Sequence, residues 1–340
     1  MTPLVSILIP AYNAERFLAQ TIQSALAQTW ARKEVVIVDD GSRDGTLAVA
    51  RRFESAALKV VSQPNQGAAA ARNTAFSASQ GDYIQWLDAD DLLSANKVAA
   101  QMEALRSAGP RTLASSGWGY FRARPEAAKF APTPLWESLD PVEWMTRKWE
   151  HNLHMQTATW LASRELSAAA GPWDARLLGD DDGEYFSRVI MRSDGIRFVP
   201  EGRVYYRISD ASRLSYIGAS DRKMDAQYLG MEMQIGYLRS LADTDRVREA
   251  CIVYLETWLG HFHPNRPDIV ERARSLARAL GRELRLPTLS WKYDWIRRAF
   301  GWQAAKRAQI RYNECKSMLL SRWDRTLHQL RGGIFDATRI

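Results

Sequence analysis

The sequence predicts an α/β fold whose sheet is mainly parallel, followed by a helical C-terminal region. In the first hundred residues, short β-prone runs alternate with segments of helical periodicity, which is typical of βαβ units. Several of these runs are apolar almost throughout, as in strands that are buried on both faces. The 340 residues are 46% hydrophobic and 25% charged, a globular composition that allows one large domain or a domain with an appendage.

The predicted elements follow one another from the N-terminus. Strands are expected at residues 4–10, 35–38, 58–62 and 83–87, and helices at 14–28, from Asp44 or Thr46 to residue 57, and at 68–78. Asn13 is the predicted N-cap of the first helix. Later elements are a helix at 95–108, a strand at 111–121 that returns to the sheet, a loop at 122–140, a helix at 141–149, and a strand at 154–161.

Four polar residues stand directly after predicted strands, namely Tyr12, Asp39, Asp40 and Asp88. Parallel α/β sheets bind ligands at the carboxyl ends of their strands. We therefore expect these side chains to lie together on one rim of the sheet.

An acidic triplet follows the fourth predicted strand. If the backbone stays extended, Asp88 and Asp90 point the same way, and a hard divalent cation would reconcile their like charges. Mg²⁺ or Mn²⁺ held by one or two carboxylates usually takes its other ligands from water and substrate phosphates. The alternative is that these aspartates cap the next helix, a role that we expect of Asp91.

Two common nucleotide-binding motifs are missing. No Gly-x-Gly-x-x-Gly follows the first strand, and the sequence contains no Gly-Lys-Ser or Gly-Lys-Thr. Dinucleotide-binding and P-loop sites therefore lack their phosphate cradles. An acidic rim needs a metal to bind a pyrophosphate, which again indicates a cation at Asp88 and Asp90.

Four motifs in a fixed order carry a family resemblance. They are VSILIPAYN at residues 5–13, VIVDDGS at 36–42, NQGAAAARN at 65–73 and DAD at 88–90. With them, residues 1–216 resemble the catalytic domain of the family 2 glycosyltransferases. The resemblance implies the GT-A fold, a Rossmann-like βαβ arrangement with a mainly parallel sheet and flanking helices, and leaves residues 217–340 as a helical region.

The resemblance also implies a nucleotide-sugar site. Tyr12 stacks near the base, Asp39 accepts a hydrogen bond from it, Arg72 lies near the diphosphate, and Asp90 with Asp88 binds Mn²⁺ or Mg²⁺. The residues implied for the nucleotide sugar are Pro10, Tyr12, Asp39, Asp40, Asn65, Gly67, Arg72, Asp88 and Ala89. Alternatives stay open for three of them, since Tyr12 fits a packed loop aromatic, Arg72 a surface charge, and Asp40 a residue that orients the loop.

A second acidic stretch runs from Asp180 to Asp182. In the resembled family an acidic pair opens a helix here, an Arg follows six residues after its second member, and that member is the catalytic base. Asp182 with Arg188 matches this spacing, and Asp181 remains its rival because the register of three aspartates is ambiguous. A carboxylate within hydrogen-bond reach can take the proton of an attacking hydroxyl. Asp180 is expected to satisfy the helix N-terminus.

Several further residues are candidates around this site. His154 and Trp173 are candidates for the acceptor pocket. By resemblance, residues 195–206 form the family's next strand. Arg207 and Ser212 then belong to its following basic and small polar loop, with Arg207 either near the diphosphate or a charge at the sheet edge.

The C-terminal region combines positive charge with aromatic residues. Helices are expected at 224–241, 246–259 and 269–284, and an apolar stripe runs at helical spacing from Trp291 to Leu330. Residues 282–340 contain thirteen Lys or Arg against five Asp or Glu, an excess of eight positive charges. Such a helix can lie on an anionic membrane surface, or it can pack on the catalytic domain or on a second subunit as a homodimer. Nucleic acid is not an expected partner, because no binding module accompanies the charge.

The compartment is inferred from composition. We expect neither a signal peptide nor a membrane span, and the remote Cys251 and Cys315 are expected to be buried free thiols in a reducing compartment. The sequence thus indicates a cytoplasmic protein, with peripheral contact at the inner face of the cell membrane as one option.

Together these features predict a metal-dependent, inverting glycosyltransferase of polysaccharide or glycoconjugate synthesis. The donor would be a nucleotide sugar, with UDP favoured and GDP or dTDP as alternatives, and the acceptor a glycan or glycolipid. One rival is a non-catalytic protein that binds nucleotide or glycan. Another is nucleotidyl transfer, which would release pyrophosphate.

Overall fold

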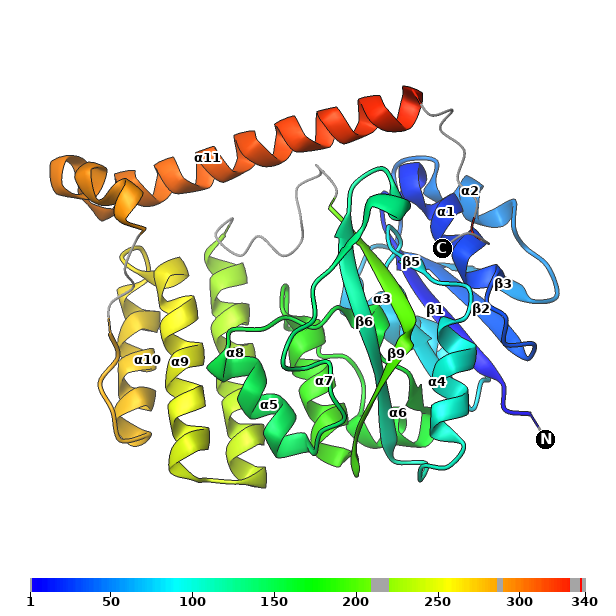
Figure 1. Ribbon diagram of the computed structural model, residues 1–340, viewed down its shortest axis with the longest axis horizontal. Coiled ribbons are helices and arrows are strands. Elements are labelled where there is room, and N and C mark those ends of the chain that lie inside the picture. The colour runs from blue at the N-terminus through cyan, green and yellow to red at the C-terminus, as the bar shows by residue number, and fades with distance from the viewer. Residues whose placement is uncertain (1, 209–219, 286–289, 331–336, 338–340) are drawn as a thin grey trace.

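The computed structural model describes residues 2–208, 220–285, 290–330 and 337. A five-stranded sheet lies at the centre of the N-terminal part, with strand order β3-β2-β1-β4-β8 (Figure 1). Its strands are β1 (Val5–Ala11), β2 (Lys33–Asp39), β3 (Leu58–Ser62), β4 (Tyr83–Trp86) and β8 (Ala162–Ser163). The first four are parallel and β8 runs antiparallel to β4, which confirms the mainly parallel sheet.

The parallel register brings the carboxyl ends of the strands together. Ala11 pairs with Asp39, and Asp39 with Ser62, at the ends of β1, β2 and β3. Because the side chains of β1 and β2 are almost fully buried, these strands form the inner layer that holds the rim in place.

The first three helices connect these strands. They are α1 (Glu15–Leu26), α2 (Thr46–Arg51) and α3 (Ala68–Ala78). α2 ends earlier than predicted, because a tight bridge between Ser55 and Leu58 turns the chain into β3. Asn13 is not the N-cap: it adopts a left-handed conformation (φ 49°), and its Oδ1 accepts a hydrogen bond from the Arg43 backbone N–H. A short polar side chain tolerates this conformation, and here it ties two rim loops together.

A second sheet of order β5-β9-β6-β7 packs beside the first. It comprises β5 (Leu92–Leu93), β6 (Thr112–Phe121), β7 (Lys129–Phe130) and β9 (Gly195–Arg207). The prediction that residues 111–121 return to the main sheet is wrong, because β6 pairs in parallel with β9 over its whole length. No local sequence pattern shows whether β6 pairs with the main sheet or with β9.

The predicted strand at 154–161 is also wrong. These residues form a loop with a single 3-10 turn, Thr157–Thr159, before the short β8. The Gln156 side chain accepts from the Ala158 N–H, and the Thr159 hydroxyl donates to the Gln156 carbonyl at 2.6 Å. These local hydrogen bonds replace the strand ladder that alternation suggested.

Helices make up most of the remaining chain. They are α4 (Lys97–Leu105), α5 (Pro141–Glu150), α6 (Arg164–Ala170), α7 (Asp181–Arg192), α8 (Asp221–Leu241), α9 (Asp245–Phe262), α10 (Pro267–Ala279) and α11 (Asp294–Leu330). Figure 1 shows α8, α9 and α10 side by side, and α11 crossing the molecule from α10 towards α1. The backbone of α11 breaks at Gly301, with φ 82°. Within the part of the chain described here, no helix is both long and apolar enough to cross a membrane.

The helices α8 to α10 share one hydrophobic core with the sheets. The same cluster of buried residues contains Ile7 of β1, Tyr228 of α8 and Leu255 of α9. The predicted domain boundary at 216/217 and Ser212 both lie outside the described residues. The thiols are free, as expected, but only Cys251 is buried, whereas Cys315 is exposed on α11.

Candidate active site

Arg72 of α3 lies at the centre of the rim. Its Nη2 contacts Asp88 Oδ1 at 3.1 Å, and its Nη1 contacts Asp181 Oδ2 at 2.6 Å. The guanidinium lies 4.3 Å from the ring centroid of Trp173, and Arg72 is only 7% exposed. The alternative that Arg72 is a surface charge is therefore wrong. Arg72 joins the DxD motif to the second acidic stretch.

Negative charge exceeds what Arg72 can neutralise. Burial raises the pKa of Asp181 to about 6; the Arg72 charge opposes this shift, and the charges of Asp182 and Asp88 add to it. Burial, together with Asp90 and Asp88, likewise raises the pKa of Asp91 well above its usual range. A cation bound at this rim would relieve that repulsion.

The DxD motif lies in a turn. β4 ends at Trp86, and the Asp91 N–H donates to the Asp88 carbonyl at 3.1 Å. The backbone therefore does not stay extended, which was the condition under which Asp88 and Asp90 would point the same way. Asp91 does not cap α4 either, because it is fully buried and accepts from the Arg207 N–H at 2.8 Å and from Gln156 Nε2 at 2.5 Å.

The residues of this turn fit a divalent cation by their chemistry. Carboxylate oxygens are the hard ligands that Mg²⁺ and Mn²⁺ prefer, and two of them suffice when substrate phosphates complete the coordination. Within the described residues no three His, Cys, Asp or Glu side chains gather into a metal cage. Asp88 and Asp90 therefore fit a metal that is shared with a phosphate-bearing substrate.

The loop after β2 is held by Asp40. Its Oδ1 accepts from Gln63 Nε2 at 2.7 Å and from the Gln66 N–H at 2.9 Å, and its Oδ2 accepts from the Gly67 N–H at 2.8 Å. The Asn65 amide donates to the Asp40 carbonyl at 2.9 Å. Asp40 and Asn65 therefore shape the loop, and Gly67 supplies the positive φ of 90° with which α3 begins.

Two other rim residues remain available to a ligand. Asp39 is 2% exposed; its Oδ2 accepts from the Ser42 N–H at 3.4 Å, and its buried Oδ1 has no hydrogen-bond partner among the described residues. Tyr12 is 42% exposed, so it is not a packed loop aromatic. Pro10 lies half-buried at the end of β1, and the Ala89 carbonyl accepts from the Thr21 hydroxyl at 2.9 Å.

The three aspartates at the start of α7 have three different surroundings. Asp180, with φ 54°, turns its Oδ2 towards Gln234 Nε2 (3.0 Å) and the Tyr254 hydroxyl (3.1 Å), and makes no capping bond to α7. The expectation that Asp180 satisfies the helix N-terminus is therefore wrong, because partners on α8 and α9 take its carboxylate. Asp181 is held by Arg72.

Asp182 faces a pocket. Its Oδ2 accepts from the Thr157 hydroxyl at 3.1 Å and its Oδ1 from the Gly183 N–H at 2.9 Å, and it forms no ion pair with any described residue. The pocket is also lined by Lys148 and His154. Sequence reasoning missed Lys148 and Thr157, since one looks like a helix-surface charge and the other lies in a stretch predicted as strand.

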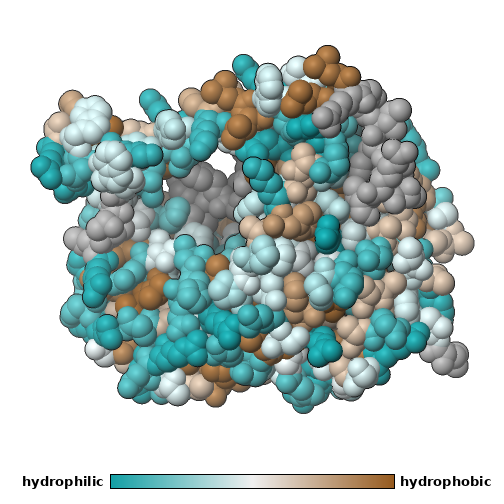
Figure 2. Space-filling model, viewed as in Figure 1, coloured by the Kyte–Doolittle hydropathy of each residue, from teal (hydrophilic) through white to brown (hydrophobic). Residues whose placement is uncertain are grey.

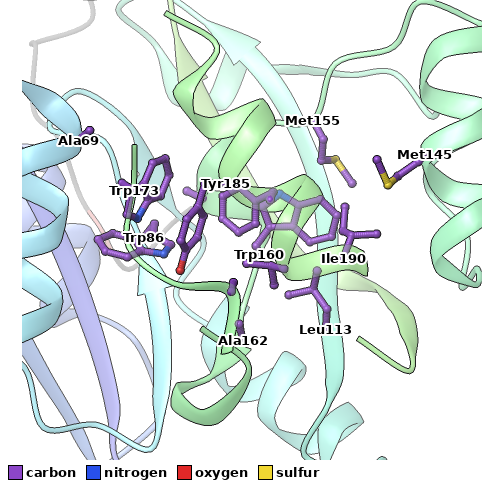
Figure 3. Packing of buried hydrophobic residues seen from close by; sticks show 14 of the residues in the cluster. Ala69, Trp86, Leu113, Met145, Met155, Trp160, Ala162, Trp173, Tyr185 and Ile190 are labelled. Carbon is purple, nitrogen blue, oxygen red and sulfur yellow. The ribbon is translucent and has the colours of Figure 1, made fainter. Parts of the chain in front are cut away.

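The two acceptor candidates lie in different settings. His154 lies at the pocket near Asp182 and is exposed to solvent, and partial desolvation by the surrounding protein lowers its pKa. Trp173 is only 3% exposed, stacks on Tyr185 at 4.1 Å and meets Trp86 edge-on at 5.2 Å. Figure 3 shows these three rings together in the core. Trp173 therefore supports Arg72 from beneath, and its assignment as an acceptor residue is wrong.

Arg188 does not reach Asp182. Its Nε contacts Glu184 Oε1 at 2.7 Å, and its Nη2 donates to the Pro172 carbonyl at 2.8 Å. It therefore holds the loop before α7, and with it the start of the helix that carries the aspartates.

Comparison with known proteins agrees with this geometry. The family model described as "Glycosyl transferase family 2" matches residues 6–166. The "Uncharacterized glycosyltransferase EpsJ" of Bacillus subtilis is 30% identical over 240 residues, which cover 67% of this chain and 68% of that protein. The "UDP-Glc:alpha-D-GlcNAc-diphosphoundecaprenol beta-1,3-glucosyltransferase WfgD" of Escherichia coli is 40% identical over 103 residues, 30% of this chain and 41% of that protein.

Solved structures share the fold. The S. aureus TarS fragment 1–349 in complex with UDP-GlcNAc aligns with a TM-score of 0.64 and 15% identity, over 82% of this chain and 83% of that one. The mannosyltransferase PcManGT from Pyrobaculum calidifontis, in complex with GDP-Man and Mn²⁺, aligns with a TM-score of 0.54 and 18% identity, over 95% and 88% of the two chains. These likenesses confirm the predicted GT-A fold. The match to the family model and the match to EpsJ over two thirds of both chains show that this chain is a glycosyltransferase and belongs to family 2 of these enzymes.

Proposed function

We propose that the protein is a metal-dependent, inverting glycosyltransferase that moves a sugar from a nucleotide sugar to a hydroxyl acceptor. The observation that carries this proposal is the pairing of Arg72 with both Asp88 and Asp181. This pairing brings the DxD turn and the acidic start of α7 into one site. Donor and acceptor chemistry can thus meet within a few ångströms of one guanidinium.

On the donor side, the exposed Tyr12 ring offers a stacking face for a base, and the unpartnered Asp39 Oδ1 offers an acceptor for its N–H group. Arg72 lies deeper, where it can meet a diphosphate. Pro10, Gly67 and Ala89 contribute backbone positions around this space.

Asp88 and Asp90 would hold Mg²⁺ or Mn²⁺, which when bound neutralises charge on the departing diphosphate. The surplus of buried negative charge at the rim supports this assignment. The Mn²⁺ in the PcManGT complex supports it by analogy.

Asp182 is the proposed base. The acceptor hydroxyl loses its proton to Asp182 as its oxygen attacks the anomeric carbon, the bond from that carbon to the phosphate oxygen breaks, and the nucleoside diphosphate leaves. One displacement from the opposite face inverts that carbon. Asp182 suits this role better than Asp181, because Asp181 is committed to Arg72 whereas Asp182 faces the pocket.

The comparisons suggest substrate classes. UDP-GlcNAc and UDP bind TarS, and GDP-Man binds PcManGT, so a UDP sugar is the favoured donor, with GDP and dTDP sugars as alternatives. WfgD acts on a sugar linked to diphosphoundecaprenol, and TuaG of Bacillus subtilis carries the name of a teichuronic acid biosynthesis glycosyltransferase. We therefore propose a glycan or glycolipid acceptor of the cell envelope.

We also propose that α11 rests on an anionic membrane surface. Its outward residues include Tyr312, Leu319 and Trp323, which are 61%, 66% and 66% exposed, together with Arg311 and Arg322. Figure 2 shows hydrophobic side chains on the outer side of this helix. Exposed aromatic and basic side chains together are typical of helices at a membrane interface. A homodimer through the same face is the competing arrangement.

The test of donor chemistry is a thermal-shift screen of UDP, GDP and dTDP sugars with Mn²⁺, followed by analysis of products. A ligand that binds only the folded state raises the melting temperature. Release of a nucleoside diphosphate supports glycosyl transfer. Release of pyrophosphate from a nucleoside triphosphate and a sugar phosphate would instead show nucleotidyl transfer.

A further inference from the structure

A basic pocket is lined by residues of α1, the end of β9 and α11. Figure 1 shows the C-terminal end of α11 lying near α1. The lining includes Arg16, Gln20, Arg122, Arg207, Arg325 and His328. The family resemblance placed one of them, Arg207, either near the diphosphate or at the sheet edge; it is 4% exposed, and its Nε donates to the Asp90 carbonyl at 2.7 Å. The other five were not predicted as nucleotide-sugar residues. The cavity measures about 210 Å³, whereas roughly 10–15 Å³ of such space admits one water molecule, so a multi-atom ion fits.

The pocket has a surplus of positive charge. Its described lining contains four arginines and no carboxylate, and Arg16 and Arg122 form no ion pair with any described residue. The nearby carboxylate of Asp324 is already taken by Arg124, at 2.7 Å. The Arg207 guanidinium is already hydrogen-bonded within the protein, because its Nη1 donates to the Arg122 carbonyl at 3.1 Å and its Nη2 to Gln20 Oε1 at 2.7 Å.

The docking of α11 places its basic side chains in this pocket. Ser321 is buried and accepts from Arg122 Nε at 3.1 Å, and Asp324 accepts from the Ala123 N–H at 2.9 Å. Arg325 and His328 follow Ser321 by four and seven residues, so they lie on the same inner face of the helix. Two separate parts of the chain therefore build the pocket.

We propose that this pocket binds a phosphate or diphosphate group at a site separate from the donor site. Arginines present forked N–H donors that match the oxygens of phosphate, and charge-assisted hydrogen bonds are the strong ones. Arg16 and Arg122 present such forks together with the amide N–H groups of Gln20, and α11 supplies Arg325 and His328. The anion would thus be gripped jointly by the catalytic core and the C-terminal helix.

The test uses the full chain and inorganic pyrophosphate in EDTA, where a metal-bridged donor site does not contribute. Calorimetry at low salt should show saturable binding. The double variant Arg16→Gln/Arg325→Gln should weaken the affinity by about tenfold or more, since hydrogen bonds to charged groups contribute about 1.5–3 kcal/mol each. If the double variant does not fold, Arg16→Gln alone, at an exposed position, should still weaken binding.

The matched control is Arg311→Gln/Arg322→Gln, which removes the same charge from exposed positions of α11. It should change the affinity for pyrophosphate by no more than about twofold, because solvent and salt screen exposed charges that lie outside the pocket. Competition distinguishes two sources of the phosphate: displacement of pyrophosphate by UDP indicates a nucleotide, and displacement by vesicles containing phosphatidic acid indicates a lipid headgroup. An absence of saturable binding, or equal losses in the control and the double variant, would overturn the proposal.

Discussion

At the scale of single residues, Arg72 separates the roles of Asp181 and Asp182. A buried guanidinium needs a counter-charge, and Asp181 supplies one at 2.6 Å while Asp182 hydrogen-bonds to Thr157. Neighbouring carboxylates in one helical turn can therefore do different work. The variant Arg72→Lys should not hold Asp88 and Asp181 together as Arg72 does, because an ammonium lacks the fork that reaches two carboxylates at once.

Asp182→Asn should keep donor affinity and lower kcat by roughly 10²–10⁴, the usual contribution of a general base. The proposed donor contacts lie elsewhere, at Tyr12 and Asp39. Calorimetry with the donor and a nucleotide-release assay with an acceptor measure the two quantities. Asp181→Asn is the control, with a smaller loss of kcat; a large loss there with a near-normal rate for Asp182→Asn would reverse the assignment.

Asp181 should make stability depend on pH in metal-free buffer. Burial raises its folded-state pKa to about 6, above the ordinary 3.8 that we take for the unfolded chain, so the folded state binds the proton more tightly between these values. The free energy of unfolding should therefore fall as pH rises from about 4 to about 6, with a slope of at most about 1.4 kcal/mol per pH unit from this group. Urea titrations should show a flatter profile for Asp181→Asn. Identical profiles for both proteins would contradict the shift.

Asp90→Asn should abolish donor turnover and remove the Mn²⁺-dependent part of the thermal stabilisation by a nucleoside diphosphate. The reason is that one of the two proposed metal-binding carboxylates is lost while the fold is retained. Melting curves with and without Mn²⁺ measure this effect. Full activity of the unaltered enzyme in EDTA would rule out the metal assignment.

At the scale of elements, α11 depends on a few polar anchors. Only Ala305 and Ser321 of this 37-residue helix are buried, so little apolar packing holds it. Asp324 bonds the Ala123 N–H and the Arg124 guanidinium at the far end. We therefore expect α11 to open locally at a lower free energy than the helices and strands of the main core.

Asp324→Ala should release the C-terminal half of α11 without unfolding the core. Hydrogen exchange should accelerate in residues 311–330 and stay unchanged in α8 to α10, which share the main core. Glu314→Ala, at an exposed position of the same helix, is the control and should leave exchange as it is. Unchanged protection in the Asp324 variant would mean that other contacts hold the helix.

At the scale of the whole molecule, α11 presents a basic and aromatic surface on one side. The protein should sediment with anionic vesicles at low salt and be released at high salt, because salt screens surface attraction. A chain ending at Leu280, and the double variant Leu319→Ser/Trp323→Ser, should both sediment less. Equal sedimentation of the shortened chain would show that α11 is not the anchor.

The sequence by itself determined the parallel sheet, the rim and the family. β1 to β4 and α3 lie where apolar runs and turn residues predicted them, because a strand buried on both faces leaves an unmistakable local pattern. The four motifs are local too, since each is a continuous run of residues in the sequence. For the same reason the acidic start of α7 could be predicted, although the sequence does not show which of the three aspartates has which role.

Only the tertiary structure decided which side chains meet. The pairing of Arg72 with Asp88 and Asp181, the burial of Trp173, the partnership of β6 with β9 and the docking of Asp324 all join residues that are distant in the chain. Periodicity reports which face of an element is buried but not what covers it, so these contacts have no sequence signature. The roles of three adjacent aspartates depend on partners from α3, from α8 and α9, and from the loop that contains Thr157, and folding alone brings those partners to them.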